Sequence, residues 1–555
     1  MKKIGKITIV LFGMMAFYSC TNLNEIILDE YNATTVTDKQ AADGILAPAY
    51  ALLPSIYQHT NLFALTEIST DEAILPYRGG TDWGDNGIYL SLHRHQTTST
   101  DPNVRNTWNL ILQGLSRSVT AINSLKVNKD PSANLYIAEA RGMRAYYNLL
   151  MLDLFGIAFQ KEELGDVSTI LRTDKAVEYI RTELLAIEPI VETTTGPGRI
   201  TKGAVWGLLA KLHLNAAAYR DPYGATLNHS AADMDKVIEY TGKIISSGQY
   251  ALSSDYFAIF GNDNHTNKEL IFAVDQRAEL NGHNRMSYFS LANDQRPLPA
   301  YPAANGTDGP AITPDFYRSW VNAYGTVDPA DADPRFYKKN VDPTVECVDG
   351  NSYNIDRGIL RGQQYGLVYQ SGAFVKCADG KYKVGPLYNT RGKAPYPLVI
   401  HSLDVNFTTA GSDYSTGYRV EKYEFSKKSS SGRNFGEADI VIIRLADAYL
   451  MRAEAKLRKS DAAGALVDVN AVRAARTKPA PALTSIDLNT LLRERGFEFY
   501  WENQRRTDLI RFGKYEDSWT EKNSTDKNMR LFPIPQTAID GASNLTGYLK
   551  QNPGY

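Results

Sequence analysis

The sequence predicts a mainly α-helical fold: a superhelix of tetratricopeptide-like helical hairpins that carries a long, irregular, loop-rich insertion. Three observations support this prediction. Apolar residues recur three and four positions apart before residue 250 and again after residue 436. Small residues stand where paired helices must approach closely, as they do in tetratricopeptide units. The residues between, 251–435, hold much of the Gly, Pro, Asn and Asp and only short apolar runs.

Six segments of the N-terminal part have the spacing of helices. Within 136–155, for example, Met143 and Tyr147 share one face with apolar neighbours three or four positions away. Gly156 is suited to end that helix, and Thr201 is suited to cap a later one. The six expected helices are 39–57, 108–125, 136–155, 176–190, 202–219 and 233–246.

Three more helices are expected near the C-terminus, at 444–458, 461–476 and 490–503. The first two are predicted to form a hairpin, because alanines occupy the positions where both helices approach each other. These alanines are Ala448, Ala453, Ala455 and Ala465. No clean repeat period is visible, so the hairpins are degenerate. The helices on both sides of the insertion are therefore expected to share one core.

The composition is that of a folded globular protein. Hydrophobic residues make up 43% and charged residues 22% of the 555 positions. The length corresponds to roughly three to four average domains. The formal net charge is -2, so no basic excess is present to neutralise phosphates, and nucleic acid is not expected as a partner. The 34 tyrosines suit both half-exposed binding surfaces and packing between helices.

The N-terminus has the layout of a bacterial lipoprotein signal. Three lysines precede an apolar run, 7–17, which Cys20 closely follows. The run is too short to span a bilayer as a mature helix. We expect residues 1–19 to be removed and Cys20 to be acylated, which would hold the protein at a membrane surface. Bulky residues just before the cysteine make the match loose, and a plain secretory signal is the alternative.

Cys347 and Cys377 are the two remaining cysteines. In an exported protein two cysteines can pair as a disulfide. Their spacing in the sequence does not fix the geometry that a disulfide needs. Pairing and free thiols are therefore both open at this point.

Glu494, Glu498 and Glu502 recur four positions apart on one predicted helix. Carboxylates at that spacing could carry out acid–base chemistry on a sugar. Arginines lie beside them in the sequence, so ion pairs between residues i and i+4 along the helix are the simpler interpretation. We expect no catalytic residue.

No metal or cofactor site is expected. His93 and His95 could share a strand face as metal ligands do, but no third ligand lies near them in the sequence. Asp331 and Asp333 lack the glycine and the spaced acids of a calcium loop, so a turn is favoured. The sequence also has no phosphate-binding loop, no serine elbow and no paired Cys-x-x-Cys.

The strongest candidate for a binding site is segment 77–89, YRGGTDWGDNGIY. Its glycines permit loop conformations that other residues resist. The Trp83 ring could stack on the apolar face of a sugar while carboxylate, amide and guanidinium groups bind the hydroxyls. The candidate contact residues are Tyr77, Arg78, Asp82, Trp83, Asp85 and Asn86. The alternative is that Trp83 pins the loop to the core.

The insertion supplies further candidates, because long irregular segments on a helical scaffold commonly carry function. These candidates are Asn284, Arg285, Tyr288, Tyr301 and Trp320. Burial cannot be judged from the sequence, so each of them can instead be a packing residue.

Seven segments occur in a specific order along the chain. They are the signal that ends in Cys20, RGGTDWGDNGIYLSLHRH (78–95), AEARGMRAYYNLLMLDLFG (138–156), RITKGAVWGLLAKLHLNA (199–216), VIIRLADAYLMRAEA (441–455), ERGFEFYWENQRRTDLIRFG (494–513) and LFPIPQTAI (531–539). The ending, NPGY (552–555), also fits. As a set they resemble the SusD/RagB family over nearly the whole mature chain.

The resemblance implies an α-rich superhelix with a loop-rich face, held outside the outer membrane by a lipid anchor. It implies a partner as well, a SusC-like TonB-dependent transporter barrel that the protein covers as a lid. Ligands in the family are commonly oligosaccharides, and some members carry peptides. Ligand contacts in the family come from loops in the region of 77–89 and in the middle insertion.

The expected organisation is one continuous fold with a signal peptide, a tether, two helical parts and an insertion between them. The boundaries are 1–19 for the signal, 20–35 for the tether, 36–250 for the N-terminal helical part, 251–435 for the insertion and 436–555 for the C-terminal helical part. The leading hypothesis is a cell-surface glycan-binding lipoprotein of a Gram-negative bacterium, without catalysis. A peptide-binding RagB-like receptor, a glycoside hydrolase and a tetratricopeptide adaptor are the alternatives.

Overall fold

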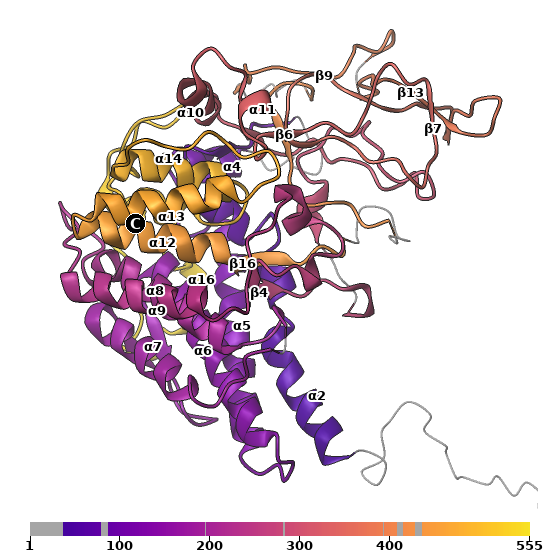
Figure 1. The fold of residues 1–555 in the computed structure, drawn as a ribbon. Coiled ribbons are helices and arrows are strands. Elements are labelled where there is room, and N and C mark those ends of the chain that lie inside the picture. The colour runs from indigo at the N-terminus through magenta and orange to yellow at the C-terminus, as the bar shows by residue number, and fades with distance from the viewer. Residues whose placement is uncertain are drawn as a thin grey trace, which may run out of the picture.

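The computed structural model shows stacked helical layers with a strand-rich insertion extending from one side (Figure 1). It describes residues 37–78, 87–194, 196–280, 284–391, 393–407, 414–427 and 436–555. The predicted mainly helical fold is confirmed. None of the helices in these ranges combines the length and the apolar character needed to cross a membrane.

The first half of the chain forms the predicted helices with slightly different ends. Its elements are α2 (Asp38–Tyr50), α3 (Leu53–Ile56), the π-helix η2 (Ala64–Ile68), α4 (Ile88–His93), α5 (Pro102–Leu125), α6 (Ala133–Phe155), α7 (Thr173–Ile187), α8 (Lys202–Arg220) and α9 (Ala231–Ser246). The single helix expected at 39–57 is instead two helices. Pro54 lies in the first turn of α3 and has no backbone N–H to donate to the carbonyl of Tyr50, the last residue of α2.

Two of these helix ends are defined by residues that the sequence predicts as caps. Thr201 accepts a hydrogen bond from the Ala204 backbone N–H at the start of α8. Gly156 ends α6 in the left-handed conformation, with φ 69°, which a residue without Cβ adopts at little cost. Both predicted caps are confirmed.

The second half adds seven helices to the described ranges. They are α10 (Pro314–Tyr324), α11 (Pro329–Ala332), α12 (Leu445–Arg458), α13 (Ala462–Ala474), α14 (Leu488–Phe499), α15 (Arg505–Arg511) and α16 (Gln536–Gly541). The three helices expected here correspond to α12, α13 and α14.

The most extensive helix–helix contacts join α5 with α6, α8 with α9, α9 with α12, and α12 with α13. Glycine permits one such approach. A Cβ at Gly114 of α5 would lie 2.5 Å from the Tyr147 ring of α6, so no larger residue fits there. The predicted hairpin of α12 and α13 is confirmed, and its alanines are buried.

A small sheet links the two halves of the chain. Strand β4 (Leu270–Val274) pairs antiparallel with β16 (Ile440–Arg444), and every residue of both strands is buried. The main hydrophobic core contains both strands together with side chains from α5, α6, α8, α9 and α12. Helices from both sides of the insertion therefore enclose one core.

The insertion contains short antiparallel strands in sheets of two or three. They are β5 (Ala311–Ile312), which pairs with β1 (Ala73–Ile74), β6 (Tyr337–Lys338), β7 (Cys347–Val348), β8 (Arg357–Leu360), β9 (Gly362–Gln363), β10 (Tyr365–Leu367), β11 (Tyr369–Gln370), β12 (Ala373–Phe374), β13 (Tyr382–Pro386), β14 (Ile400–His401) and β15 (Arg419–Glu421). Outside the insertion, β2 (Ala158–Gln160) pairs with β3 (Thr169–Leu171).

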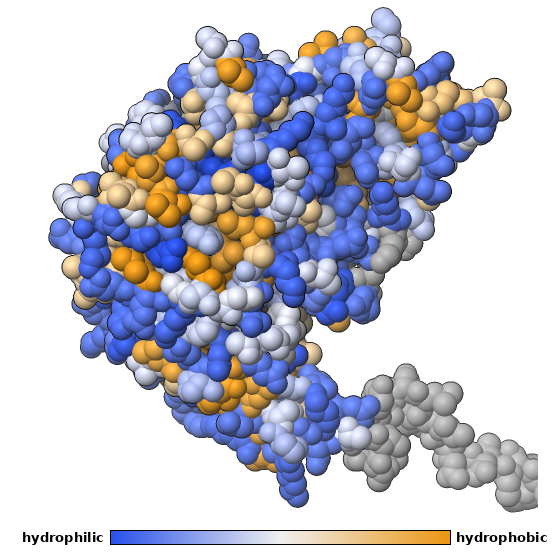
Figure 2. Space-filling model, viewed as in Figure 1, coloured by the Kyte–Doolittle hydropathy of each residue, from blue (hydrophilic) through white to orange (hydrophobic). Residues whose placement is uncertain are grey.

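Residues 345–386, here called the arm, project farthest from the helical layers (Figure 1). A second, smaller core joins buried residues of the arm, such as Tyr353 and Leu367, to residues outside it, such as Tyr288 and Leu298, and is here called the core beneath the arm. In Figure 2 the visible face is mostly hydrophilic, with apolar spots over the helical layers and on the arm. The insertion thus has a packed interior of its own.

Candidate functional site

Segment 77–89, the strongest sequence candidate, is described at both of its ends. Tyr77 is half-buried and Arg78 is fully buried, directly after the short strand β1. Gly87, at the other end, has a φ of 85° and begins α4. The remaining candidates of this segment, Asp82, Trp83, Asp85 and Asn86, lie outside the described residues, as does Cys20.

Two buried arginines, Arg78 and Arg419, form what we call the arginine hub. Arg78 donates hydrogen bonds to the carbonyl oxygens of Gly309 (3.2 Å) and Thr416 (3.3 Å). Arg419 donates to the same two carbonyls, at 2.7 Å and 3.1 Å. Guanidinium groups have five donors, so they can satisfy several carbonyls of irregular backbone at once. The hub therefore ties the base of segment 77–89 to two distant segments.

Asp308 balances part of the positive charge at the hub. Its carboxylate lies 3.0 Å from the Arg391 guanidinium and accepts a hydrogen bond from the Asn293 backbone N–H. Burial raises the pKa of this carboxyl, although Arg419 and Arg391 act in the opposite direction. Nearby His401 donates to or accepts from the Ser415 carbonyl, and burial lowers the pKa of its imidazole to about 3.

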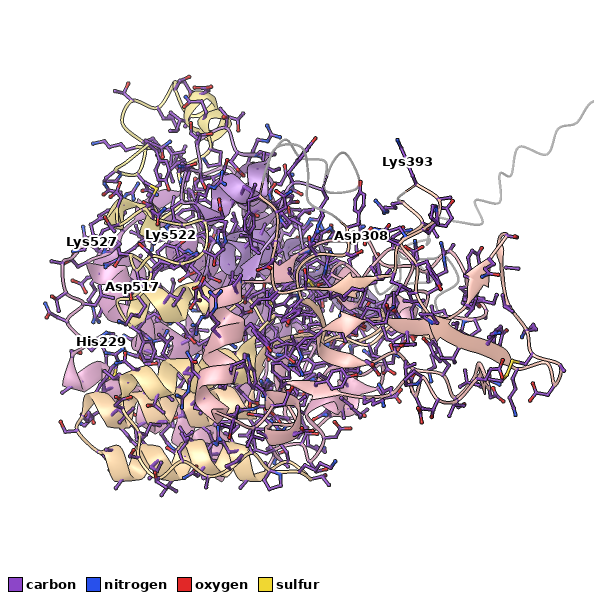
Figure 3. All side chains as sticks on the ribbon, turned by 90° about the horizontal axis from the view of Figure 1, so that it is seen from above. His229, Asp308, Lys393, Asp517, Lys522 and Lys527 are labelled. Atoms are coloured by element: carbon purple, nitrogen blue, oxygen red, sulfur yellow. A yellow bond between two sulfur atoms is a disulfide. The ribbon has the colours of Figure 1, made fainter. Side chains whose placement is uncertain are left out.

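The ribbon formed by residues 387–400 lies beside the hub and turns one apolar face to solvent. Leu387 and Val399 point inward and pack on Ala292. The alternating residues point outward, because side chains alternate along a strand. The exposed residues are Tyr388, Tyr396, Leu398 and Ile400. Figure 3 shows Asp308 within the molecule and Lys393, from the tip of this ribbon, at its outer edge.

The structure corrects three of the insertion candidates. Trp320 is fully buried, and its ring stacks on Phe497 with centroids 3.7 Å apart. Tyr288 is fully buried in the core beneath the arm. Asn284 is also fully buried and donates to the Ala438 carbonyl at 2.6 Å. No part of these three side chains reaches solvent, so they serve packing and not ligand contact.

Arg285 and Tyr301 remain half-buried, and both can present part of their surface to a ligand. The Arg285 guanidinium lies 5.9 Å from the centre of the Tyr288 ring. Arg78 differs from both, because it is fully buried. Its expected ligand contact is therefore also corrected: it positions the segment by binding backbone carbonyls.

Comparison with known proteins shows which family has this architecture. A family model described as the SusD family matches residues 268–555, which is more than half of the chain. The chain belongs to the SusD family. Starch-binding protein SusD of Bacteroides thetaiotaomicron is 28% identical over 439 residues, 75% of this chain and 72% of that protein.

Solved structures share the SusD fold along most of the chain. A SusD superfamily protein of Parabacteroides distasonis superposes with a TM-score of 0.64 at 18% identity, covering 94% of this chain and 100% of the other. Surface glycan-binding protein A of Bacteroides thetaiotaomicron, in complex with laminarihexaose, gives a TM-score of 0.63 at 19% identity and covers 92% and 99%. The predicted resemblance and SusD-like fold are confirmed.

In this SusD-family chain the acidic residues of the C-terminal motif are buried in ion pairs. Glu498 contacts Arg444 (2.6 Å), Arg476 (2.9 Å) and Arg335 (3.1 Å). The arginines come from other elements, so the expected pairing along one helix was wrong. Burial would raise the pKa of Glu498, but these arginines hold it well below its usual range.

The neighbours Glu494 and Glu502 have the same kind of environment. Glu494 contacts Arg473 at 2.7 Å, and Glu502 contacts Lys422 at 2.6 Å. Both carboxylates are at most 2% exposed. All three acids of this motif are therefore out of reach of a substrate and stabilise the core.

Both histidines and Asp333 have structural partners as well, whereas Asp331 is exposed in α11. His93 hydrogen-bonds the Ile68 and Thr520 carbonyls, and His95 hydrogen-bonds the Ser69 carbonyl. Both rings are buried rather than at a loop border, and burial lowers the pKa of His95 to about 3. Asp333 is buried against Arg335, with which it forms an ion pair at 2.6 Å.

One group in the described part of the chain has the donor set of a metal site. His265, Asp275 and Asp439 place one ligand atom each within 4.8 Å of one another. These atoms already serve each other: His265 contacts Asp439 at 2.7 Å, and Asp275 pairs with Arg277 at 2.8 Å. The hydrogen bond to Asp439 raises the pKa of His265. The group is satisfied as an ion-pair cluster.

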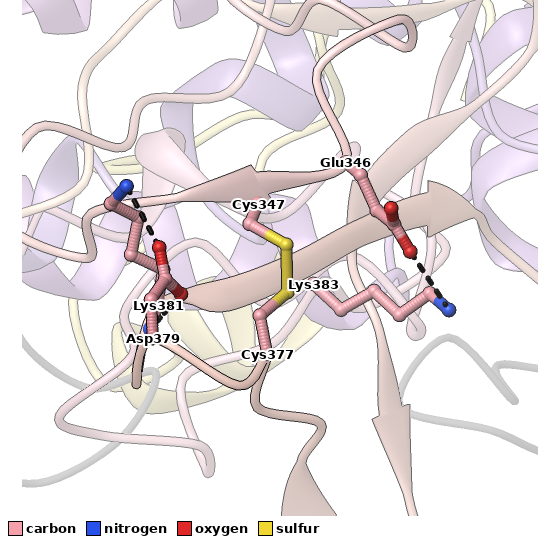
Figure 4. The surroundings of a disulfide bond; sticks show 6 residues. All are labelled: Glu346, Cys347, Cys377, Asp379, Lys381 and Lys383. Carbon is pink, nitrogen blue, oxygen red and sulfur yellow. Dashed lines mark hydrogen bonds and ion pairs between the residues drawn. A yellow bond between two sulfur atoms is a disulfide. The ribbon is translucent and has the colours of Figure 1, made fainter.

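The two cysteines of the insertion are joined in the structure. Cys347 and Cys377 form a disulfide that closes a segment with a sequence separation of 30 (Figure 4). Lys383 pairs with Glu346 at 3.5 Å, and Lys381 pairs with Asp379 at 2.9 Å, on either side of it. The disulfide links β7 to the loop between β12 and β13 within the arm.

Sequence reasoning missed the residues that assemble the hub. Arg419, Asp308 and Arg391 are far apart in the chain and belong to no motif that marks a site. Arg419 lies in strand β15, where its neighbour Val420 is an ordinary strand residue. The signal available in the sequence was a charged residue placed between Tyr418 and Val420, which are typical strand residues.

Proposed function

We propose that this SusD-family chain is a cell-surface lipoprotein that captures oligosaccharides and delivers them to a SusC-like TonB-dependent transporter. The observation that carries the proposal is its relationship to glycan-binding proteins. The 28%-identical relative is a starch-binding protein, and a structural relative is a surface glycan-binding protein in complex with laminarihexaose. Both support glycan as the ligand class.

The proposed contact residues belong to segment 77–89, whose residue Arg78 is part of the hub. Trp83 would stack on a sugar ring, while Asp82, Asp85 and Asn86 would bind its hydroxyls. Tyr77, which is half-buried, would add a second ring. Arg285 is proposed as a further contact from the insertion at this site, and Tyr301 as a ligand contact elsewhere on the insertion.

The proposed position is the outer face of the outer membrane, with the acyl chains on Cys20 as the anchor. Segment 20–35 would be the tether between the membrane and the continuous fold of residues 36–555. The partner transporter and the lipid anchor are inferences from family membership.

The protein is proposed to be a receptor and not an enzyme. Its most suggestive acids, Glu494, Glu498 and Glu502, are buried and paired with cations. General acid–base chemistry on a glycosidic bond requires carboxyl groups that reach the substrate.

The test starts from a polysaccharide that retards the protein in affinity gel electrophoresis, here called the retained polysaccharide. It is titrated by calorimetry into the parent protein, Trp83→Ala and Trp206→Ala. Trp206 lies on α8, where its ring N–H donates to Glu188, so its replacement is a matched control away from the hub. We expect Trp83→Ala to weaken binding by ~2 kcal/mol or more, because it removes a stacked aromatic anchor. Equal affinity of all three proteins would remove Trp83 from the site.

A further inference from the structure

A cleft separates the arm from the segment at 297–301. The cleft has a volume of about 270 Å³ and is lined by this segment, by the turn at 349–351, and by Tyr382 and Lys427. A smaller cavity of about 90 Å³ adjoins it, because Pro297, Leu298, Tyr353 and Lys427 line both. We call the two together the arm cleft.

Two half-buried tyrosines form the aromatic walls of the arm cleft. Tyr301 packs against the core beneath the arm with part of its ring. The Lys376 ammonium lies 3.1 Å from the centre of the Tyr382 ring and so holds that ring in place. Gly350 permits the turn to approach, since a Cβ there would lie 2.6 Å from the Tyr382 ring. The turn and the ring are thus shaped around one small space.

The disulfide holds one wall of the arm cleft. Strand β7 pairs with β13, with Cys347 opposite Lys383 and Val348 opposite Tyr382. The turn at 349–351 follows β7 directly, so the Cys347–Cys377 bond fixes the turn and Tyr382 relative to each other. The wall is therefore rigid before a ligand arrives, which lowers the entropy cost of binding.

A buried carboxyl lies at the floor of the smaller cavity. Glu421 is 1% exposed, and neither of its carboxyl oxygens has a hydrogen-bond partner among the described residues. The nearby Arg357 uses one guanidinium nitrogen to bind the Lys422 and Phe260 carbonyls. Burial raises the pKa of Glu421 well above its usual range, which Arg357 opposes. A buried polar group without a partner is costly, and a ligand hydroxyl would relieve that cost.

Charged groups of both signs line the arm cleft. Asp349 and Glu424 lie among Lys338, Arg357 and Lys427, while burial favours the neutral form of Glu421 and so raises its pKa. A lining of mixed sign, together with a neutral carboxyl that both donates and accepts hydrogen bonds, favours a neutral hydroxylated ligand. The larger volume is slightly below the range of about 300–1,000 Å³ that is usual for drug-sized ligands. The arm cleft can therefore enclose a single sugar unit but not a long chain.

We propose that the arm cleft is a second glycan-binding pocket, separate from segment 77–89, that takes one neutral sugar unit at a chain end or branch. Tyr301 contacts the apolar face of the sugar, and Asp349, Asn351 and Glu421 bind its hydroxyls. This inference rests on the proposed function and adds to it the class of sugar recognised and a second point of attachment. Two attachment points on one polysaccharide raise its avidity without any new contact at the first.

The test uses neutral methyl hexosides and pentosides, together with the retained polysaccharide, as probes in calorimetry and ligand-observed NMR. The variants are Tyr301→Ala, Tyr301→Phe, Glu421→Gln and Trp83→Ala. Tyr388→Ala is the matched control, because Tyr388 is 46% exposed on the ribbon and does not line the arm cleft. Thermal unfolding confirms that each variant is folded.

We expect Tyr301→Ala to weaken binding of one methyl glycoside by about 10-fold or more, with Tyr301→Phe and Tyr388→Ala close to the parent. Trp83→Ala should keep that binding and lose affinity for the polysaccharide. If Tyr301→Ala and Glu421→Gln bind every probe as the parent does while Trp83→Ala loses the polysaccharide, the arm cleft is not a sugar pocket and the proposed function stands. If the parent binds no glycan, both proposals fail together.

Discussion

Arg444 shows how single residues hold the interior of this protein together. Its fully buried guanidinium contacts Glu498 (2.6 Å), Glu269 (2.7 Å) and Glu502 (2.9 Å), and no part of the three carboxylates is open to solvent. Lys422 adds a further cation beside Glu502. Charges this far from water are tolerated only when each is paired and hydrogen-bonded. The network is therefore a point where one substitution has a large effect.

Replacing Glu498 with Gln should lower the free energy of unfolding by about 3–5 kcal/mol, because three arginines lose their shared counter-charge. Urea denaturation followed by circular dichroism measures this. Glu178→Gln is the control: Glu178 is exposed and forms a surface ion pair with Arg181, so we expect a change of less than about 1 kcal/mol. Equal stability of both variants would show that the buried network does not stabilise the core.

Two other buried acids, Glu67 and Glu72, have pKa values that are raised, whereas the pKa of Glu498 is lowered. Glu67 and Glu72 share a hydrogen bond, and burial raises the pKa of Glu72 to about 7, with Glu67 also raised. Their other oxygens accept backbone N–H groups of Gln504 and Trp501, in a turn where Trp501 has a φ of 62°. The pair thus retains a proton that an unfolded chain would release.

Stability should therefore fall as the pH rises through this range. A raised folded-state pKa contributes stability that is complete below the unfolded value of 4.5 and is lost as the pH passes about 7. Glu72→Gln mimics the protonated acid, so its stability relative to the parent should rise between pH 5 and pH 8, by up to roughly 2–3 kcal/mol. Urea unfolding at both pH values measures it, and a difference that does not vary with pH would contradict the shared proton.

At the scale of elements, the sequence predicted what is local and missed what is long-range. The caps at Thr201 and Gly156 and the hairpin of α12 and α13 follow from neighbouring residues, and the structure confirms them. The pairing of β4 with β16 joins residues about 170 positions apart, and no local pattern specifies it. Trp320 resembled a binding residue by type, but the partner that buries it, Phe497, lies in another element.

The arm is the element whose stability depends most on a covalent link. Cys347→Ser together with Cys377→Ser removes a cross-link that closes about 30 residues, which should destabilise the arm by about 3–4 kcal/mol. Most buried apolar residues of the arm belong to the core beneath the arm, so the effect should stay local. Hydrogen exchange should speed up in peptides of the arm and stay unchanged in α6. Faster exchange in α6 as well would show that arm and helices unfold together.

At the scale of the whole molecule, the helical layers form the scaffold and the insertion presents the loops. The arm cleft is lined by residues of the insertion, and the arginine hub joins Arg78 to insertion residues, whereas residues of the helical layers contribute to the main core. Elements after residue 436 complete a core begun by the helices before residue 250. The position of segment 77–89 therefore depends on both halves of the chain.

The proposed lipid anchor determines where the whole molecule is located. Cys20→Ser in the full-length precursor should abolish acylation and release the protein from the outer-membrane fraction, because one residue would carry the whole anchor. Fractionation with immunoblotting, alongside metabolic labelling with a fatty acid, measures both effects. Continued membrane association of the unlabelled variant would mean that protein contacts, and not lipid, hold it there.

The most direct test of the central claim is affinity gel electrophoresis of the mature protein without Cys20 against a panel of polysaccharides. We predict that one class of neutral polysaccharide retards the parent and that Trp83→Ala migrates freely through the same gel. Retardation by no polysaccharide would contradict a glycan receptor and would favour peptide cargo, or a lid that binds only together with its transporter.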